Sequence, residues 1–236
     1  MPNFTLVITI TEDWSRKEIF ILLIIKLGLP MTTSYRTITE KIAGLLSPIE
    51  AYFFYCLALC SECNSMKSFA KQANLAEFWG INKVDQIREY LKRFKSLGLI
   101  EIDKFEVHGQ YGKFNRCSYK LDNEHFVEIS SQLYSEDISK ELKGFLILLK
   151  CKCFNGSNTT QYSQAALADE LNLSPSTVSR KIKEGIAKGY IKKDKNGIHL
   201  TKDDIFKITK ETEIGIMKCV YPSIITDEDI ARGYIK

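Results

Sequence analysis

Apolar residues recur every three or four positions in the segment 175–189, which is the spacing of one face of an α-helix. That face comprises Val178, Ile182 and Ile186. Ser174 and Pro175 stand where an N-cap and a first helical residue belong, and Gly189 suits a left-handed cap at the other end. A shorter helix rich in Ala and Leu, 164–171, is expected before it, across a turn at Asn172-Leu173. The pattern predicts a helix-turn-helix.

A basic hairpin is expected directly after this motif. Tyr190-Ile191 begins a strand, and Asn196-Gly197 is typical of a hairpin turn. Between Ser174 and Lys195 there are seven Lys and Arg residues against two acidic ones, whereas the whole chain has a net charge of only +4. A helix in the major groove needs short donors and Arg on its exposed face, and a basic wing can reach phosphates.

The segment therefore predicts double-stranded DNA as a partner. The alternative is a solvated amphipathic helix in another small α/β domain. The candidate DNA-binding residues here are Ser174, Ser176, Thr177, Ser179, Arg180, Lys181, Lys183, Lys192, Lys193 and Lys195.

The same pattern occurs earlier in the chain. Residues 72–77 align with 164–169, and Gly98 aligns with Gly189. In this copy the second helix, 83–97, has an apolar face made of Val84, Ile87, Leu91 and Phe94. Two copies at domain-sized spacing predict a duplicated domain and not a solenoid.

The wing of the first copy is longer and less basic. Strands are expected at 101–108 and 116–121, with 109–113 as the loop, and three acidic residues dilute the first strand. We expect this copy to contact DNA more weakly or to serve mainly in dimerisation. Its candidate DNA-binding residues are Asn82, Lys83, Gln86, Lys92, Arg93, Lys113 and Arg116.

Further elements surround the two motifs. Ser47, Pro48 and Glu50 form a capping-box start for an apolar helix that runs to about Leu59. Residues 122–134 are expected to be a connection, and 135–138 to open a helix whose buried body is 145–149. Near the N-terminus we expect a strand at 4–10 and a helix at 19–27, with Met31 as an alternative start. Residues 201–236 suggest one or two helices broken at Tyr221-Pro222.

Composition narrows the function. An apolar fraction of 44% suits a globular protein. Seven cysteines without a signal peptide or a membrane-length apolar run favour a cytoplasmic protein with reduced thiols and no membrane contact. Zinc bound by Cys60, Cys63, Cys151 and Cys153 is disfavoured because Cys60 belongs to an apolar run and no His has ligand spacing. No catalytic constellation or nucleotide loop is present, so we expect no enzyme, cofactor or metal.

LSPSTVSRKI, residues 173–182, resembles the recognition helix of the winged helix-turn-helix superfamily. LSP at 46–48, LAEFWGINK at 75–83 and GLI at 98–100 resemble the helix-turn-helix domain of phage and plasmid replication proteins. The resemblance covers about 35–205. It implies an α+β, mostly helical fold with two tandem winged helix-turn-helix domains, 35–125 and 126–205, an N-terminal extension, 1–34, and a C-terminal helical tail, 206–236.

In replication initiators such domains bind repeated origin DNA, and one of them also mediates dimerisation. By this resemblance Ser176, Thr177, Ser179, Arg180 and Lys183 would contact bases. Glu89 departs from the pattern, because a carboxylate on the matching face of the first copy repels phosphate unless it accepts from a cytosine amino group.

Three functions are therefore in view. The first is a replication initiator of a plasmid, phage or mobile element, which would bind direct repeats. The second is a transcription regulator, which would bind an inverted repeat over a promoter. The third is a winged-helix protein-interaction scaffold. A homodimer and host replication proteins are further candidate partners.

Overall fold

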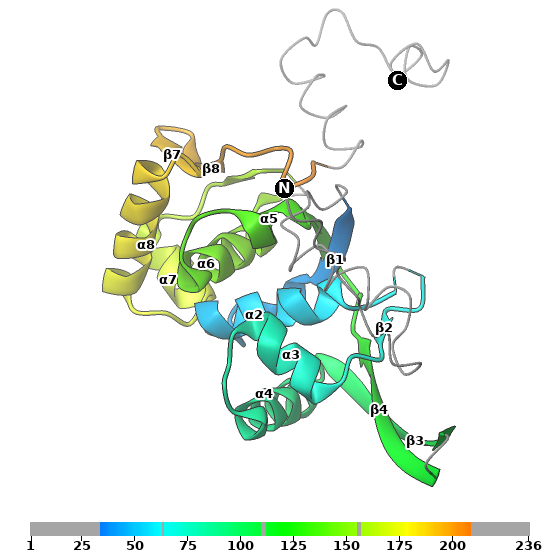
Figure 1. Cartoon of the computed structure of the whole chain (residues 1–236). Coiled ribbons are helices and arrows are strands. Elements are labelled where there is room, and N and C mark those ends of the chain that lie inside the picture. The colour runs from blue at the N-terminus through cyan, green and yellow to red at the C-terminus, as the bar shows by residue number, and fades with distance from the viewer. Residues whose placement is uncertain (1–33, 63, 110–111, 155–156, 209–236) are drawn as a thin grey trace, which may run out of the picture. The chain divides into compact units, whose positions relative to one another are not determined.

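The computed structural model describes residues 34–62, 64–109, 112–154 and 157–208, and all of them fall within one compact unit that begins at Thr33 (Figure 1). The predicted strand at 4–10, the predicted helix at 19–27 and the predicted helical tail from 209 onward lie outside the described residues.

The first half of this unit builds a small sheet against three helices. Its elements are β1 (Tyr35–Thr39), the 3-10 helix η1 (Glu40–Ile42), α2 (Pro48–Leu59), β2 (Lys67–Ser68), α3 (Gln72–Trp79), α4 (Val84–Ser96), β3 (Ile100–Gly109) and β4 (Gly112–Leu121). The sheet is antiparallel with strand order β2-β4-β3.

The second half follows the same plan after one further strand and a short helix. Its elements are β5 (Phe126–Ser130), α5 (Gln132–Ser135), α6 (Lys140–Cys151), β6 (Thr159–Thr160), α7 (Gln164–Glu170), α8 (Pro175–Ala187), β7 (Ile191–Asp194) and β8 (Gly197–Leu200). Its sheet is also antiparallel, with strand order β6-β8-β7.

The two halves agree at the positions where the backbone must turn. Gly80 and Asn172 end the first helix of each motif with φ of 63° and 51°, and Gly98 and Gly189 follow the second helix with φ of 71° and 76°. Both second helices are 13 residues long. Lys83 is the N-cap residue of α4, as Ser174 is of α8, so Lys83 is the structural counterpart of Ser174.

The helices α2 and α6 form the centre of the core. The predicted capping box starts α2: Glu50 accepts from the Ser47 amide at 2.8 Å, and every residue from Glu50 to Leu59 is buried. All residues of α6 from Leu142 onward are buried as well. Gly144 lies against α2 so closely that an added Cβ would be 1.6 Å from the carbonyl oxygen of Pro48. Each half thus covers the first long helix of the other.

The segment 122–134 is more than a connection, which corrects the sequence-based expectation. It contains β5, which pairs antiparallel with β1 from Tyr35↔Ser130 to Thr39↔Phe126. The buried Tyr55 hydroxyl donates to the Ser130 carbonyl at 2.7 Å. This pairing joins residues about 90 positions apart, so no local pattern signals it.

The helix expected to open at 135–138 begins instead at Lys140. Ser139 is its N-cap, and the Ser139 hydroxyl accepts from the Leu142 amide at 3.1 Å. Glu136 is used elsewhere, since it accepts a hydrogen bond from the Tyr190 hydroxyl. That hydrogen bond and burial together raise the pKa of Tyr190.

The start of the C-terminal segment packs on the same chain. Residues 201–208 are not helical. Ile205 and Phe206 are buried, the Ser130 amide donates to the Ile205 carbonyl at 2.7 Å, and Phe206 forms a bridge with Ile129. For these two apolar residues the partner surface is therefore β5.

Both hairpins differ in detail from the prediction. The β3–β4 ladder closes at Gly109↔Gly112, so Lys113 lies in strand β4 and not in the loop, whereas Arg116 lies in a strand as predicted. The β7–β8 ladder closes at Asp194↔Gly197, which places the turn at Lys195-Asn196 and not at Asn196-Gly197. In Figure 1 the longer β3–β4 hairpin extends away from α3 and α4.

Candidate nucleic-acid interface

The motif α7–α8 is built by local hydrogen bonds that the sequence encodes. The Ser163 hydroxyl accepts from the Ala166 amide at 3.1 Å and caps α7. Asn172 takes the left-handed conformation in the turn. The Ser174 hydroxyl accepts from the Thr177 amide at 3.2 Å and caps α8, whose first residue is Pro175.

One face of α8 packs on the core, through two of the three residues expected. Val178 and Ile182 are buried as predicted, but Ile186 is 45% exposed. Gly185 takes the buried place because β7 crosses α8 there: an added Cβ on Gly185 would lie 2.5 Å from Cδ1 of Ile191. The core face therefore follows i, i+4, i+7 and not i, i+4, i+8.

The opposite side of α8 presents Ser176, Arg180 and Lys183, all exposed and spaced four and three positions apart. We call these three residues the α8 stripe. It offers a hydroxyl, a guanidinium and an ammonium group along two turns of one helix. Those donors match the acceptors that guanine and the phosphates present in the major groove. Thr177 and Ser179, which are half-buried, lie at its flanks.

Two predicted contact residues have structural roles instead. Lys181 is 3% exposed, and its Nζ lies 3.1 Å from Oε2 of Glu141 and 3.0 Å from Oε2 of Glu184. Lys181 thus ties α8 to α6 and points away from the stripe, which corrects its assignment to DNA. The Ser174 hydroxyl is engaged in the helix cap and lies 2.8 Å from Oγ1 of Thr177.

The hairpin β7–β8 adds positive charge beside α8. Lys192, Lys193 and Lys195 are exposed on it, as the sequence predicts. Asp194 accepts from the Asn196 amide at 2.8 Å and lies 2.9 Å from Nε2 of His199. The interaction with His199 and the Asn196 hydrogen bond lower the pKa of Asp194. The carboxylate therefore serves to hold the hairpin turn.

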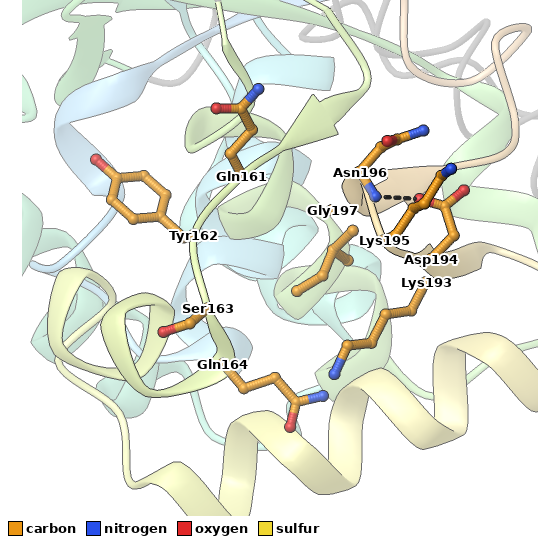
Figure 2. Close-up of a pocket in the computed structure, with 10 residues that line it drawn as sticks. Gln161, Tyr162, Ser163, Gln164, Lys193, Asp194, Lys195, Asn196 and Gly197 are labelled. Atoms are coloured by element: carbon orange, nitrogen blue, oxygen red, sulfur yellow. Dashed lines mark hydrogen bonds between the residues drawn. The ribbon is translucent and has the colours of Figure 1, made fainter.

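A hollow of about 760 Å³ separates the hairpin from the segment 161–164. Figure 2 shows the side chains of Lys193 and Gln164 pointing toward one another, from the hairpin and from the start of α7. Gln164 and Tyr162, which also lines the hollow, are not among the residues that the sequence predicts to contact DNA. An exposed aromatic residue in a polar loop before a helix was the available signal.

The first half presents a different stripe at the equivalent place. Counting from the N-cap, Asp85, Glu89 and Lys92 of α4 occupy the positions of Ser176, Arg180 and Lys183, and all three are exposed. Asp85 forms an ion pair with Arg88 at 2.6 Å. The α4 stripe therefore carries two carboxylates where α8 has a hydroxyl and a guanidinium.

The other candidates of the first half do not gather into one basic surface. Arg93 lies off the stripe, and its Nε is 2.5 Å from Oε1 of Glu50 at the start of α2, so its predicted contact with DNA stays a prediction. Lys113 pairs with Glu106 across the β3–β4 hairpin at 3.0 Å. Arg116 is half-buried on β4. Asn82, Lys83 and Gln86 are exposed at the start of α4.

The described part of the chain was predicted to hold no metal and to have no membrane contact. No group of three or more His, Cys, Asp or Glu side chains is placed to hold a metal ion there. Across the same residues, no helix has the length and apolar character needed to cross a membrane.

Comparison with known proteins bears on the second motif. A search of curated proteins gave no match to the chain. Residues 161–192, from the residue after β6 to the second residue of β7, match the family of winged helix-turn-helix DNA-binding domains. The match covers the capped helix pair, the α8 stripe and the first lysine of the hairpin. This part of the chain is therefore similar to winged helix-turn-helix DNA-binding domains.

Proposed function

We propose that the protein binds double-stranded DNA in a sequence-specific manner, without catalysis of its own, through α8 and the β7–β8 hairpin. In this proposal α8 enters the major groove and the α8 stripe contacts base edges. The hairpin lysines lie along the phosphates. The observation that carries the proposal is the stripe itself, three exposed donors opposite a buried face, within the segment that matches a DNA-binding family.

We further propose that residues 48–121 are another winged-helix unit, in tandem with the one that contains α8. The recurring element order, the recurring sheet order and the paired left-handed residues support this. Asp85 and Glu89 on the exposed stripe of α4 would meet the phosphates of the major groove with like charge. In our proposal this unit therefore supports α8 or mediates assembly, and does not insert α4 into a groove.

For the biological role we propose initiation of replication on a plasmid, phage or mobile element in the cytoplasm. The resemblance of residues 46–48, 75–83 and 98–100 to replication proteins supports it. Selection of bound duplexes from a random pool tests the role. Direct repeats among the selected sites would favour initiation, whereas an inverted repeat would favour transcription regulation.

DNA binding itself is tested by anisotropy titration of labelled duplex DNA across a salt series. We expect affinity to fall steeply with salt and the double variant Arg180→Ala/Lys183→Ala to bind at least about tenfold more weakly, because each base or phosphate contact is worth on the order of 1–3 kcal/mol. Lys92→Ala, at the matching position of α4, is the control and should change little.

The same titration can also overturn the proposal that the protein binds DNA through α8. Absence of binding at low salt would overturn the proposal, and so would equal binding by the wild type and the double variant. Either result would favour the protein-interaction scaffold.

A further inference from the structure

Two neighbouring hollows meet at Tyr162. The first, of about 760 Å³, lies between the β7–β8 hairpin and residues 161–164. The second, of about 580 Å³, is lined by residues 151–154 and 160–162. Gln161 and Tyr162 line both. The two hollows therefore adjoin at residues 161–162, and we call the pair the path; its first hollow lies beside the basic hairpin.

The path carries exposed aromatic rings. Phe154 is 71% exposed, which makes it the most exposed large apolar side chain in the described part of the chain, and Tyr162 is 41% exposed. Both line the second hollow. Leaving a phenyl ring in water forgoes about 1.5–3 kcal/mol of burial free energy, so these rings are available to a flat apolar partner.

The charge along the path favours a polyanion. Lys193 and Lys195 line the first hollow and are exposed. The one carboxylate among its lining residues, Asp194, is held by Asn196 and His199. In the second hollow Lys152 forms an ion pair with Glu170 at 2.7 Å. Lys193 and Lys195 thus stand at the hairpin end, and the aromatic rings and the Lys152–Glu170 pair at the other.

We propose that this path binds unpaired nucleotides of a DNA strand next to the duplex held by α8, with bases stacked on Tyr162 and Phe154 and phosphates near Lys193 and Lys195. Aromatic platforms beside a basic groove are the chemistry by which proteins hold single-stranded nucleic acid without reading its sequence. The inference rests on the proposed duplex binding by α8 for its location, although the path can be tested separately.

The test compares two probes that share one duplex. One is blunt, and the other continues on one strand as a single-stranded extension that contains a fluorescent base analogue. We expect the wild type to bind the extended probe more tightly and to quench the analogue. Phe154→Ala/Tyr162→Ala should lose at least about fivefold in affinity for the extended probe. Its affinity for the blunt duplex should be unchanged.

Two control variants keep the test sharp. Tyr162→Phe retains the ring and should bind both probes as the wild type does. Phe126→Ala removes another exposed phenyl ring, on β5, which lines neither hollow, and should also leave both affinities unchanged. Equal wild-type affinity for the two probes would overturn the proposal, as would an equal loss on both in the aromatic double variant.

The same experiment separates this inference from the proposed function. Loss of binding to both probes in Arg180→Ala/Lys183→Ala supports duplex binding by α8. If the blunt duplex does not bind at all, the duplex proposal fails. In that case the single-stranded extension is tested by itself as an oligonucleotide. Binding that Phe154→Ala/Tyr162→Ala weakens would still support nucleotide binding along the path.

Discussion

At the scale of single residues, burial changes what a charged side chain does. Lys150 on α6 is 1% exposed, and its ammonium group donates to the carbonyls of Ser157 and Lys207 at 2.8 Å and to Oδ1 of Asn158 at 2.7 Å. All three acceptors are neutral. Burial therefore dominates and lowers the pKa of Lys150 to about 8. The residue links α6 to the segment that follows β8.

This shifted pKa predicts a pH dependence of stability. Between a pH of about 8 and the ordinary lysine pKa of 10.5, the unfolded chain holds a proton at Lys150 that the folded chain has released. The free energy of unfolding should therefore gain a contribution from Lys150 as pH rises. We therefore expect the free energy of unfolding of the wild type, minus that of Lys150→Met, to rise from pH 7 to pH 9. Urea unfolding of both proteins at each pH measures it.

Taking the difference from Lys150→Met cancels the contributions of groups that titrate in the same way in both proteins. Burial raises the pKa of the Cys56, Cys151 and Cys153 thiols above the ordinary value of 9.0, which lowers stability at higher pH in both proteins. The charge of Lys150 lowers the pKa of Cys151 and Cys153, so its loss in the variant acts in the same direction as the expected change. A stability difference that stays flat or shrinks across this range would show that Lys150 keeps its ordinary pKa.

At the scale of elements, α8 separates the residues that build the helix from those that face outward. Ser174 and Ser176 are both exposed serines at its start, two positions apart. The Ser174 hydroxyl accepts from the Thr177 amide and so satisfies one of the free amides of the first turn. Ser176 belongs to the α8 stripe. Neighbouring residues of one type thus have different roles.

The same substitution at these two serines should affect two different properties, stability at Ser174 and DNA binding at Ser176. Ser174→Ala should lower the free energy of unfolding by about 1 kcal/mol, the usual loss for an N-cap, and should change DNA affinity little. Ser176→Ala should leave stability within about 0.5 kcal/mol and weaken DNA binding. Urea unfolding and anisotropy titration on both variants test this. The prediction is wrong if the two serines affect both properties equally.

At the scale of the whole described unit, α2 and α6 act as one core shared by the two halves. Neither helix keeps an exposed face along most of its length: α2 is buried from Glu50 to Leu59 and α6 from Leu142 to Cys151. The Phe78 and Tyr134 rings stack at 4.5 Å, and Lys140 donates to the Trp79 carbonyl at 2.7 Å. Contacts of this kind couple the position of α8 to the first half.

The close approach of Gly144 on α6 to Pro48 on α2 gives a prediction. Gly144→Ala would gain about 1 kcal/mol in helix propensity, but its methyl group would overlap the Pro48 carbonyl, and overpacking against backbone costs about 1–3 kcal/mol or more. We expect a net loss of stability in urea unfolding. Lys92→Ala, on an exposed helix face, should change stability little. Wild-type stability of Gly144→Ala would contradict the close packing of α2 on α6.

The sequence alone determined the features that depend on neighbouring residues. A serine hydroxyl accepts from amides of the next few residues, and glycine adopts positive φ without strain. The sequence therefore predicts the cap at Ser174, the capping box at Ser47 and the left-handed residues Gly98 and Gly189. Much of the candidate site followed from the same pattern, since Arg180, Lys183 and the hairpin lysines are exposed as expected.

Tertiary structure decided the features that depend on which distant segment arrives. Lys181 is buried because Glu141 on α6 meets it, Ile186 is exposed because Ile191 packs at Gly185, and Arg93 is drawn to Glu50. The β1–β5 pairing likewise joins two strands far apart in the chain. A periodic pattern gives the face on which a side chain lies, but its surroundings are set by non-local packing, which local periodicity does not encode.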